Sequence, residues 1–363
     1  MSKNILMAVF GPIQTDARVI RSAKSLNSVG CKIDLISWNS VENYSSPYFN
    51  SINFKINKGI FNVLIFWFKV LWYIFKNRKK IDLVYCHDYF MAFPGRLSRI
   101  LFNKKWVYDA HELMLYKKNE KVSTREKIFS FLERISIKSA SLVIEANYER
   151  MRVIKSVYKL KNCTYVQNIS DIENINELDI NSPKDNIIVY QGILDDSRNV
   201  KFYVQMQEYL PKDYKLLLIG NGPSGEELKK EAELRNIKEN VIFAGRLTQA
   251  ELYKRSVTSK IGIVTYTTEG LNNYFCAPNK IFEYASLGIP MIGTPQPFIK
   301  AIFKKYKVGE IVEWGDKETY INAIKKIIDN YDSYTKGLSQ LLQDYNRANE
   351  SKKQNDEVLK LIN

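Results

Sequence analysis

Residues 272–294, NNYFCAPNKIFEYASLGIPMIGT, constrain the fold more than any other stretch of the chain. Pro278 is typical of the first turn of a helix, because proline lacks the N–H group that would stay unpaired there. Good helix formers occupy residues 280–286, and Gly288 favours the end of the helix. Pro290 and two apolar residues follow. The stretch therefore predicts a loop, a short helix, a turn and a buried strand.

The start of this predicted helix suits an anion. Its first N–H groups and the positive end of its dipole point beyond residues 276–278, and Lys280 adds a full positive charge. Glu283 lies one turn further along the same face, where a carboxylate can accept hydrogen bonds from two hydroxyls of a ribose. A surface ion pair between Lys280 and Glu283 is the alternative. The first interpretation predicts a nucleoside-diphosphate site with the donor-binding residues Cys276, Ala277, Pro278, Asn279, Lys280 and Glu283.

The segment PNKIFEYASLGIP resembles the donor-binding signature of the retaining glycosyltransferase family 4. The resemblance implies the GT-B fold, in which two Rossmann-like α/β domains face each other across a cleft and the C-terminal helix crosses back to the first domain. It also implies that Glu283 binds the donor ribose as the second acid of a paired-glutamate motif. The first acid would stand eight residues earlier, where this chain has Phe275. Glu269, in the preceding loop, is the candidate substitute.

Length and charge restrict the class of protein. With 363 residues the chain is long enough for two domains, each with a sizeable core. The formal net charge is +15, and residues 1–175 carry +14 of it. A basic surface on one half suits nucleic acid, an anionic membrane or a phosphate-bearing substrate. Because no nucleic-acid motif accompanies the charge, we predict no nucleic-acid partner.

The four cysteines indicate a reducing compartment. Cys31, Cys86, Cys163 and Cys276 show no paired spacing, which argues against a disulfide framework and against a zinc site. Residues 1–3 lead directly into an apolar strand and lack the pattern of a signal peptide. We therefore expect a cytoplasmic protein.

The first residues predict a strand, a helix and a second strand. In such a βαβ unit the ligand binds at the carboxyl ends of the strands. Gly11, Asp16 and Arg18 follow the first strand, so we expect them to line an acceptor site. The Asp-x-Arg-Val pattern at this turn is also similar to that of the family, and Arg18 is the residue that would meet an acceptor phosphate. A solvated arginine at a helix start is the alternative.

Residues 59–80 predict a helix that is apolar around nearly its whole circumference. The apolar run is shorter than the roughly 20 residues needed to span a bilayer. Aromatic rings followed by basic residues are typical of a helix that lies in the membrane interface beside anionic headgroups. A buried crossover helix between two strands is the alternative. The predicted membrane-contacting residues are Phe66, Trp67, Trp72, Lys76, Arg78, Lys79 and Lys80.

Both histidines of the chain follow predicted strands. His87 precedes Asp88, and His111 lies in the sequence Asp-Ala-His-Glu. Family members show similar turns, and the resemblance implies that His111 approaches the donor sugar or its departing phosphate while His87 and Asp88 border the acceptor. Structural histidines are the alternative.

The second half predicts another α/β series after a linker. Residues 168–185 are polar, lack a period and contain Pro183. We therefore expect an N-terminal acceptor-binding domain at residues 1–167, joined by the returning helix at about residues 346–363. The nucleotide-sugar donor would bind the C-terminal domain, at residues 186–345.

Glycines and cations mark the donor site of this second domain. Gly192 and Gly220 end predicted strands, although the sequence Gly-Asn-Gly-Pro at Gly220 is by itself a weak signal. Many family members carry an arginine directly after the first of these glycines, where this chain has Ile193. The phosphate contact would therefore pass to Arg198, with Lys201 or Arg246. Solvated surface charges are the alternative.

Together these features predict a retaining, metal-independent glycosyltransferase of the hexosyltransferase type. The donor would be a nucleotide-diphosphate sugar, with UDP as first choice and GDP or dTDP as alternatives. The acceptor would be a lipid-linked or free saccharide at the inner face of the cell membrane, in the biosynthesis of a surface polysaccharide such as capsule or O-antigen. Fixed positive groups would stabilise the leaving diphosphate. The predicted catalytic residues are His111, Glu283, Lys280 and Arg198.

Two other functions fit the same architecture. One is a sugar-nucleotide 2-epimerase, which would act on the nucleotide sugar without an acceptor. The other is a noncatalytic sugar-nucleotide-binding partner of a second transferase, which the phenylalanine at position 275 motivates.

Overall fold

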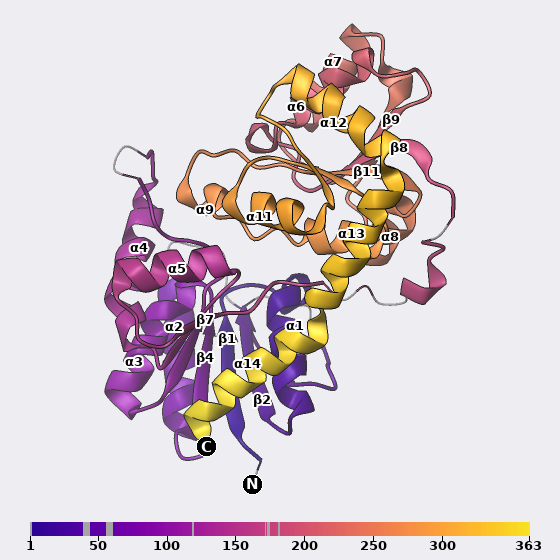
Figure 1. Ribbon diagram of the computed structural model, residues 1–363. Helices are drawn as coiled ribbons and strands as arrows, with labels where there is room; N and C mark the ends of the chain where they lie inside the picture. The colour runs from indigo at the N-terminus through magenta and orange to yellow at the C-terminus, as the bar shows by residue number, and fades with distance from the viewer. Residues whose placement is uncertain are drawn as a thin grey trace. The chain divides into compact units, whose positions relative to one another are not determined.

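The computed structural model describes residues 2–38, 44–55, 61–117, 120–170, 172, 175–180 and 182–363. The chain divides into two compact units (Figure 1). Unit 1 comprises Met1–Asn168 together with Ala348–Asn363, and unit 2 comprises Ile169–Arg347. Each unit is built on one parallel sheet covered by helices, which confirms the two Rossmann-like α/β domains predicted from the sequence.

The sheet of unit 1 has seven strands in the order β3-β2-β1-β4-β5-β6-β7. Neighbouring strands run parallel throughout. The order reverses direction at β1, and this is the point where a doubly wound sheet opens its ligand crevice at the carboxyl ends of the strands. The strands are β1 (Asn4–Val9), β2 (Lys32–Trp38), β3 (Asn50–Phe54), β4 (Leu83–His87), β5 (Trp106–Asp109), β6 (Leu142–Glu145) and β7 (Cys163–Tyr165).

The helices of unit 1 begin and end where the sequence provides caps. Asp16 accepts a hydrogen bond from the Val19 N–H at the start of α1, and Ser123 and Glu126 form a reciprocal capping box at the start of α4. Asn103 closes α3 in the left-handed conformation that asparagine tolerates. The helices are α1 (Ala17–Ser28), α2 (Asn62–Asn77), α3 (Ala92–Phe102), α4 (Thr124–Ser136), α5 (Tyr148–Tyr158) and α14 (Arg347–Ile362).

The sheet of unit 2 has six strands in the order β10-β9-β8-β11-β12-β13, and both of its faces are buried. Along β8, Val189 packs in one apolar cluster whereas Ile188 and Tyr190 pack in the other, as the alternation of side chains in a strand requires. The strands are β8 (Asp185–Gln191), β9 (Lys215–Ile219), β10 (Val241–Gly245), β11 (Ser259–Val264), β12 (Met291–Gly293) and β13 (Gly309–Ile311).

Six helices of unit 2, α6 to α11, connect these parallel strands, and α12 and α13 follow the last strand. The predicted helix over residues 280–286 is confirmed as α10. The helices are α6 (Val200–Met206), α7 (Gly225–Leu234), α8 (Gln249–Ser256), α9 (Leu271–Tyr274), α10 (Lys280–Ser286), α11 (Pro297–Tyr306), α12 (Lys317–Asp329) and α13 (Tyr331–Asp344).

The last part of the chain forms two helices, α13 and α14. Tyr345, between α13 and α14, has an extended backbone, and its ring packs against those of Phe282 and Tyr306. The break lets Leu338 and Leu341 of α13 join a core of unit 2, whereas Val358 of α14 joins the core of unit 1. A continuous helical pattern in the sequence does not show which core each part of it enters.

Helix α2 is half buried, which corrects part of the membrane prediction. Phe66 and Trp67 lie in the interior, where Phe66 packs against Phe10 and Phe54 and the Trp67 indole donates a hydrogen bond to the Phe90 carbonyl at 2.8 Å. Trp72 is exposed. Residues 59 and 60, where the predicted helix begins, lie outside the described residues. None of the helices in the described residues is long and apolar enough to cross a membrane.

Helix α14 completes unit 1 by packing beside α1 (Figure 1). Glu350 accepts a hydrogen bond from the Gln167 N–H at 2.7 Å, Ser25 donates to Asn355 at 2.9 Å, and Gln354 donates to the Tyr85 hydroxyl at 3.2 Å. These contacts attach α14 to α1, to β4 and to the segment after β7.

Replacing Val358 with aspartate is expected to destabilise unit 1. The valine is fully buried, and an unpaired charge at this site should lower the free energy of unfolding by about 3 kcal/mol, the upper end of the common range. Lys352→Asp on the exposed face of the same helix is the control, because it adds the same side chain in water. Thermal unfolding followed by circular dichroism measures both, and equal melting temperatures would contradict the packing described.

Candidate functional site

The glycine turns of unit 2 meet at the carboxyl ends of β8, β9 and β10. The Gly192 N–H donates to the Ile219 carbonyl at 2.9 Å, and the Gly220 N–H donates to the Gly245 carbonyl at 2.8 Å. A Cβ atom at Gly220 would lie 1.8 Å from the Gly192 carbonyl oxygen, and its φ of 141° also excludes most other residues. The predicted donor residues Gly192 and Gly220 are therefore required for this close approach of backbones.

Two cations lie over one aromatic ring beside these turns. The Arg198 guanidinium is 4.4 Å from the centre of the Tyr266 ring, and the Lys280 ammonium is 5.7 Å from the same centre and 4.5 Å from that of Tyr190. Arg198 also donates to the Asn273 side chain at 3.1 Å. The fold thus brings together two of the predicted phosphate-binding residues, which are 82 positions apart in the sequence.

Burial and the neighbouring charge of Arg198 lower the pKa of Lys280 to about 7, against the opposing effect of Glu283. Two cations in a poorly solvated site repel each other when the site is empty. An anion placed between them would relieve this repulsion, and it would restore the ordinary charge of the lysine. The arrangement is therefore suited to an anion with more than one negative charge.

Glu283 faces Ser170 and Gln191. The Ser170 hydroxyl donates to Oε1 of Glu283 at 2.9 Å, and the Gln191 amide donates to Oε2. Both partners hold the carboxylate in one orientation beside Lys280, which lies one turn earlier on α10. Sequence reasoning missed both Ser170, which lies in the expected linker, and Gln191, which ends β8.

The first turn of α10 already uses N–H groups in hydrogen bonds of its own. The N–H groups of Phe282 and Glu283 both donate to the Asn279 carbonyl, at 2.9 and 3.1 Å. Cys276 and Pro278 are buried, and Ala277 and Asn279 are half-buried. The side chains of Lys280 and Arg198 are therefore better placed than these two amides to bind an anion.

Two other predicted donor residues lie apart from this cluster. The Lys201 ammonium forms an ion pair with Glu227 of α7 at 2.6 Å, and Arg246 is exposed after the end of β10. Phe275 ends α9 with its ring against Tyr274, and Glu269 is exposed. The structure thus keeps Arg198 and Lys280 together and does not bring Lys201 to them.

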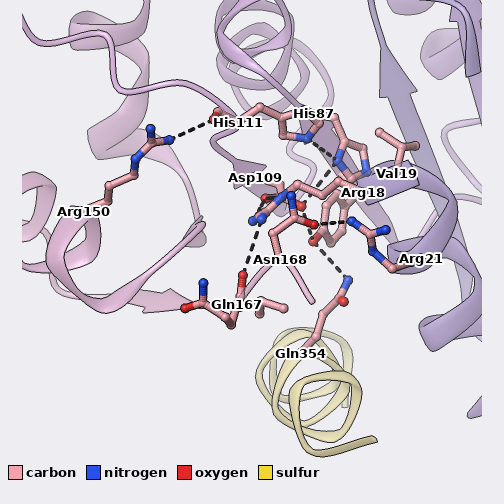
Figure 2. Close-up of polar contacts among 12 residues, drawn as sticks. Arg18, Val19, Arg21, His87, Asp109, His111, Arg150, Gln167, Asn168 and Gln354 are labelled. Carbon is pink, nitrogen blue, oxygen red and sulfur yellow. Dashed lines mark hydrogen bonds and ion pairs between the residues drawn. The ribbon is translucent and has the colours of Figure 1, made fainter. Parts of the chain in front are cut away.

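A second polar cluster lies at the carboxyl ends of β4 and β5 in unit 1, with Asp109 at its centre (Figure 2). The Arg18 guanidinium donates to Oδ1 of Asp109 at 2.6 and 2.9 Å, and the Tyr85 hydroxyl donates to Oδ2 at 3.1 Å. Nδ1 of His87 lies 3.4 Å from Oδ2. Arg18 and His87 hold the pKa of the Asp109 carboxyl well below its usual range, although burial alone would raise it.

His111 contacts this cluster from the loop after β5. Its Nε2 lies 3.3 Å from Nδ1 of His87, and its Nδ1 lies 3.7 Å from the carboxylate of Asp16. The Arg150 guanidinium donates to the His111 carbonyl at 2.9 Å. Burial lowers the pKa of His111, so the imidazole is neutral near pH 7 and can offer one donor and one acceptor.

The structure changes the expected position of Arg18. We expected its guanidinium to meet an acceptor phosphate, but it is buried and bonded to Asp109 and to the Val166 carbonyl. Asp88 has a φ of 67° and accepts the Tyr89 N–H at 2.7 Å, and burial raises its pKa to about 7. Gly11 lies at the end of β1, where its carbonyl accepts the Trp38 N–H.

Ligand atoms of His87, Asp109 and His111 lie within 4.8 Å of one another, a spacing at which three such groups can hold a metal ion. The guanidinium of Arg18 already neutralises Asp109, so a cation there would face a fixed positive charge. The sequence placed Asp109 in the turn of His111, but only the fold shows that it organises both histidines.

Residues 171–354, which form half of the chain, match the family described as "Glycosyl transferases group 1". The chain belongs to this glycosyltransferase family. A protein of Haemophilus influenzae named "Uncharacterized glycosyltransferase" is 20% identical over 289 residues, which cover 78% of this chain and 76% of that protein.

Other solved structures share the fold of this one. HepE of Anabaena, solved in complex with UDP-glucose, superposes with a TM-score of 0.72 at 13% identity, over 98% of this chain and 99% of that one. WaaG, described as a glycosyltransferase involved in lipopolysaccharide biosynthesis, gives a TM-score of 0.73 at 13% identity, over 97% and 98% of the two chains. The predicted GT-B fold is therefore confirmed.

Proposed function

We propose that this glycosyltransferase transfers a hexose, with retention of configuration, from a nucleoside-diphosphate sugar to a hydroxyl of a saccharide acceptor. The observation that carries the proposal is the pair of cations, Arg198 and Lys280, gathered over Tyr266 and Tyr190 beside the glycine turns. A departing diphosphate develops negative charge, and fixed positive groups stabilise it without reorganisation of solvent. No metal ion is required in this scheme.

The two hydrogen bonds on Glu283 support a role in holding the ribose. Ser170 and Gln191 orient the carboxylate, and a carboxylate is the kind of group that accepts hydrogen bonds from the 2′- and 3′-hydroxyls of a ribose. We propose that the neutral imidazole of His111 contacts the transferred sugar, and that Asp16, His87 and Asp88 belong to the region of unit 1 that receives the acceptor.

UDP is the nucleotide that we propose first, because HepE, which shares the fold, was solved in complex with UDP-glucose. For the acceptor we propose a lipid-linked saccharide at the cytoplasmic face of the membrane, in the assembly of a surface polysaccharide. The structural likeness to WaaG and the excess positive charge of the first half of the chain support this choice.

A thermal-shift series with UDP, GDP and dTDP tests the donor. A nucleotide that binds only the native state raises the melting temperature by mass action, so we expect the largest increase with UDP. Release of UDP from UDP-glucose is then measured with and without added saccharide. Conversion of the donor into an isomeric nucleotide sugar, without acceptor and without net release of UDP, would favour an epimerase, and binding without any turnover would favour a noncatalytic partner. No shift with any nucleotide, and no turnover, would contradict the proposed donor class.

Nucleotide binding is expected to take up a proton near Lys280. In the free protein the pKa of this lysine is about 7, so at about pH 8 most molecules hold a neutral amine. A bound diphosphate would raise the pKa and draw a proton from the buffer, and affinity for UDP should fall as the pH rises above 7. Calorimetry in two buffers of different ionisation enthalpy measures the uptake. The Lys280→Met variant should show none, whereas equal uptake by both proteins would assign the proton to another group.

A further inference from the structure

An aromatic surface lies along the exposed side of α2. Phe68, Trp72 and Phe75 are 68%, 49% and 40% exposed, and their rings follow one another at 6.4 and 5.6 Å. The centre of the Phe102 ring, at the end of α3, lies 6.0 Å from that of the Phe75 ring. These four residues, which we name the aromatic ladder, form one continuous strip of exposed and half-exposed rings.

The opposite side of α2 attaches the helix to unit 1. Phe66, Val70 and Ile74 are buried, so the helix lies along the surface of the unit with one face outward. Basic groups accompany the ladder, since Lys76 lies 5.2 Å from the Trp72 ring and Arg78 lies 4.5 Å from the Phe75 ring. Residues 61–80 contain no aspartate or glutamate. This combination of outward rings and basic charge is typical of a helix at a membrane interface.

A cationic pocket lies beside the end of the ladder. It encloses about 760 Å³ at the amino ends of β5, β6 and β7, on the opposite edge of the sheet from Asp109. None of the described residues that line it is acidic, and no described carboxylate pairs with its cations. Six of the lining residues are basic, and they are Arg99, Lys104, Lys105, Lys138, Lys159 and Lys161.

Three of these basic residues also form hydrogen bonds that stabilise unit 1. Arg99, Lys104 and Lys105 donate to the carbonyls of Ser139, Ile81 and Leu361, at 3.1, 2.6 and 2.6 Å. Hydrogen bonds to neutral carbonyls satisfy donors but leave the net charge of the pocket unchanged. Lys138, Lys159 and Lys161 are exposed at its border. The pocket therefore keeps a concentrated positive field, which an anion in it would compensate.

The pocket and the ladder share one turn of α3. Arg99 lines the pocket, Ile100 and Leu101 are 61% and 58% exposed, and Phe102 contacts the ladder. The residues that follow, from Asn103 to Lys105, line the pocket again. Apolar and cationic surfaces thus meet within seven consecutive residues.

We propose that the aromatic ladder and the cationic pocket together form a docking surface for an anionic phospholipid bilayer. The rings would enter the interfacial region, and the pocket would hold the phosphate of a lipid headgroup beside them. Charge complementarity selects this occupant, because a bilayer of anionic lipid offers apolar chains and phosphate groups side by side. This docking surface depends on the proposed function in one respect. Its purpose would be to bring the enzyme to a lipid-linked acceptor.

Vesicle flotation tests the docking surface without any turnover. The full chain is mixed with vesicles of phosphatidylcholine alone or of phosphatidylcholine with phosphatidylglycerol. We expect the wild-type protein to float with the mixed vesicles and to bind the neutral vesicles at least about tenfold more weakly. The triple variant Lys138→Gln, Lys159→Gln, Lys161→Gln should lose the preference for anionic lipid. The double variant Phe68→Gln, Trp72→Gln should lose at least about tenfold in binding to both kinds of vesicle.

Control variants change lysines and exposed apolar residues elsewhere on the surface. Lys212, Lys230 and Lys254 changed to glutamine remove three lysines from unit 2, and Leu234→Gln with Ile328→Gln removes two exposed apolar side chains. Both controls should float as the wild type does. Melting temperatures by circular dichroism show that each variant is folded.

Three outcomes would overturn the proposal. One is a wild-type protein that stays unbound with both kinds of vesicle, and another is a control that loses binding as strongly as the pocket variant. The third is a dimer in light scattering that becomes a monomer in the ladder variant while flotation is unchanged, since the ladder would then be an interface between two copies of the chain. Because UDP binding is measured separately, failure of lipid binding leaves the proposed donor site untouched.

Discussion

Replacing Lys280 with methionine is expected to lower the rate of sugar transfer by about 10² to 10³-fold, the effect of removing one group that stabilises developing negative charge. Methionine keeps most of the length of the side chain and can still pack against Tyr190. The loss would therefore reflect the missing charge more than a missing contact. Steady-state release of UDP from UDP-glucose with a saccharide acceptor measures it.

Lys300→Met is the matched control, because this lysine is exposed on α11 of the same unit. Its activity should equal that of the wild type. The Lys280→Arg variant should keep part of the rate, since it keeps the charge but changes the geometry. Activity of Lys280→Met within about twofold of the wild type would rule out the assigned role of this lysine, because an electrostatic contact of this kind contributes far more.

Replacing Asp109 with asparagine is expected to lower the free energy of unfolding of unit 1 by about 3–5 kcal/mol. Asparagine has nearly the same shape, so no cavity forms. The buried guanidinium of Arg18 would lose its countercharge, and the hydrogen bond from Tyr85 would lose a charged acceptor. Denaturant unfolding followed by tryptophan fluorescence measures the change.

Two further variants distinguish the loss of this ion pair from non-specific destabilisation of the unit. The double variant Arg18→Met, Asp109→Asn should regain part of the stability, because it removes the unpaired charge, and Asp356→Asn on the exposed face of α14 should be neutral. The wild type keeps the contribution of Asp109 above about pH 4 and loses it as the pH falls further, since the carboxyl pKa is lower in the folded state than in the unfolded one. A single variant as stable as the wild type would exclude the proposed ion pair.

Much of the fold was readable from local signals. The helix at residues 280–286 appears with its predicted bounds, and the second predicted strand of the first half forms at Lys32–Trp38, because apolar runs and residues typical of helix ends specify them locally. Strands β3 and β13 were missed. β3 has the sequence NSINF with mixed polarity, and β13 has only three residues, so each depends on pairing with β2 or β12 for its structure.

The candidate site was predicted less completely than the fold. From the sequence, we expected Arg18 and Lys201 to bind ligands. In the structure Arg18 forms an ion pair with Asp109, and Lys201 forms one with Glu227. The partners are 91 and 26 positions away along the chain, and no local pattern marks them. Phe66 and Trp67 were misassigned for the same reason, because an apolar helix does not show in sequence which of its faces is covered.

The sequence by itself determined the two α/β series, the glycine turns and the α10 segment with Lys280 and Glu283, because these depend on backbone preferences and on residues close together in the chain. Only the tertiary structure decided that Arg198 lies with Lys280 over Tyr266, that Asp109 binds Arg18, and that the rings of α2 are divided between core and surface. Those outcomes depend on contacts between distant segments, where the charge and solvation of each side chain are set by neighbours that the local sequence does not contain.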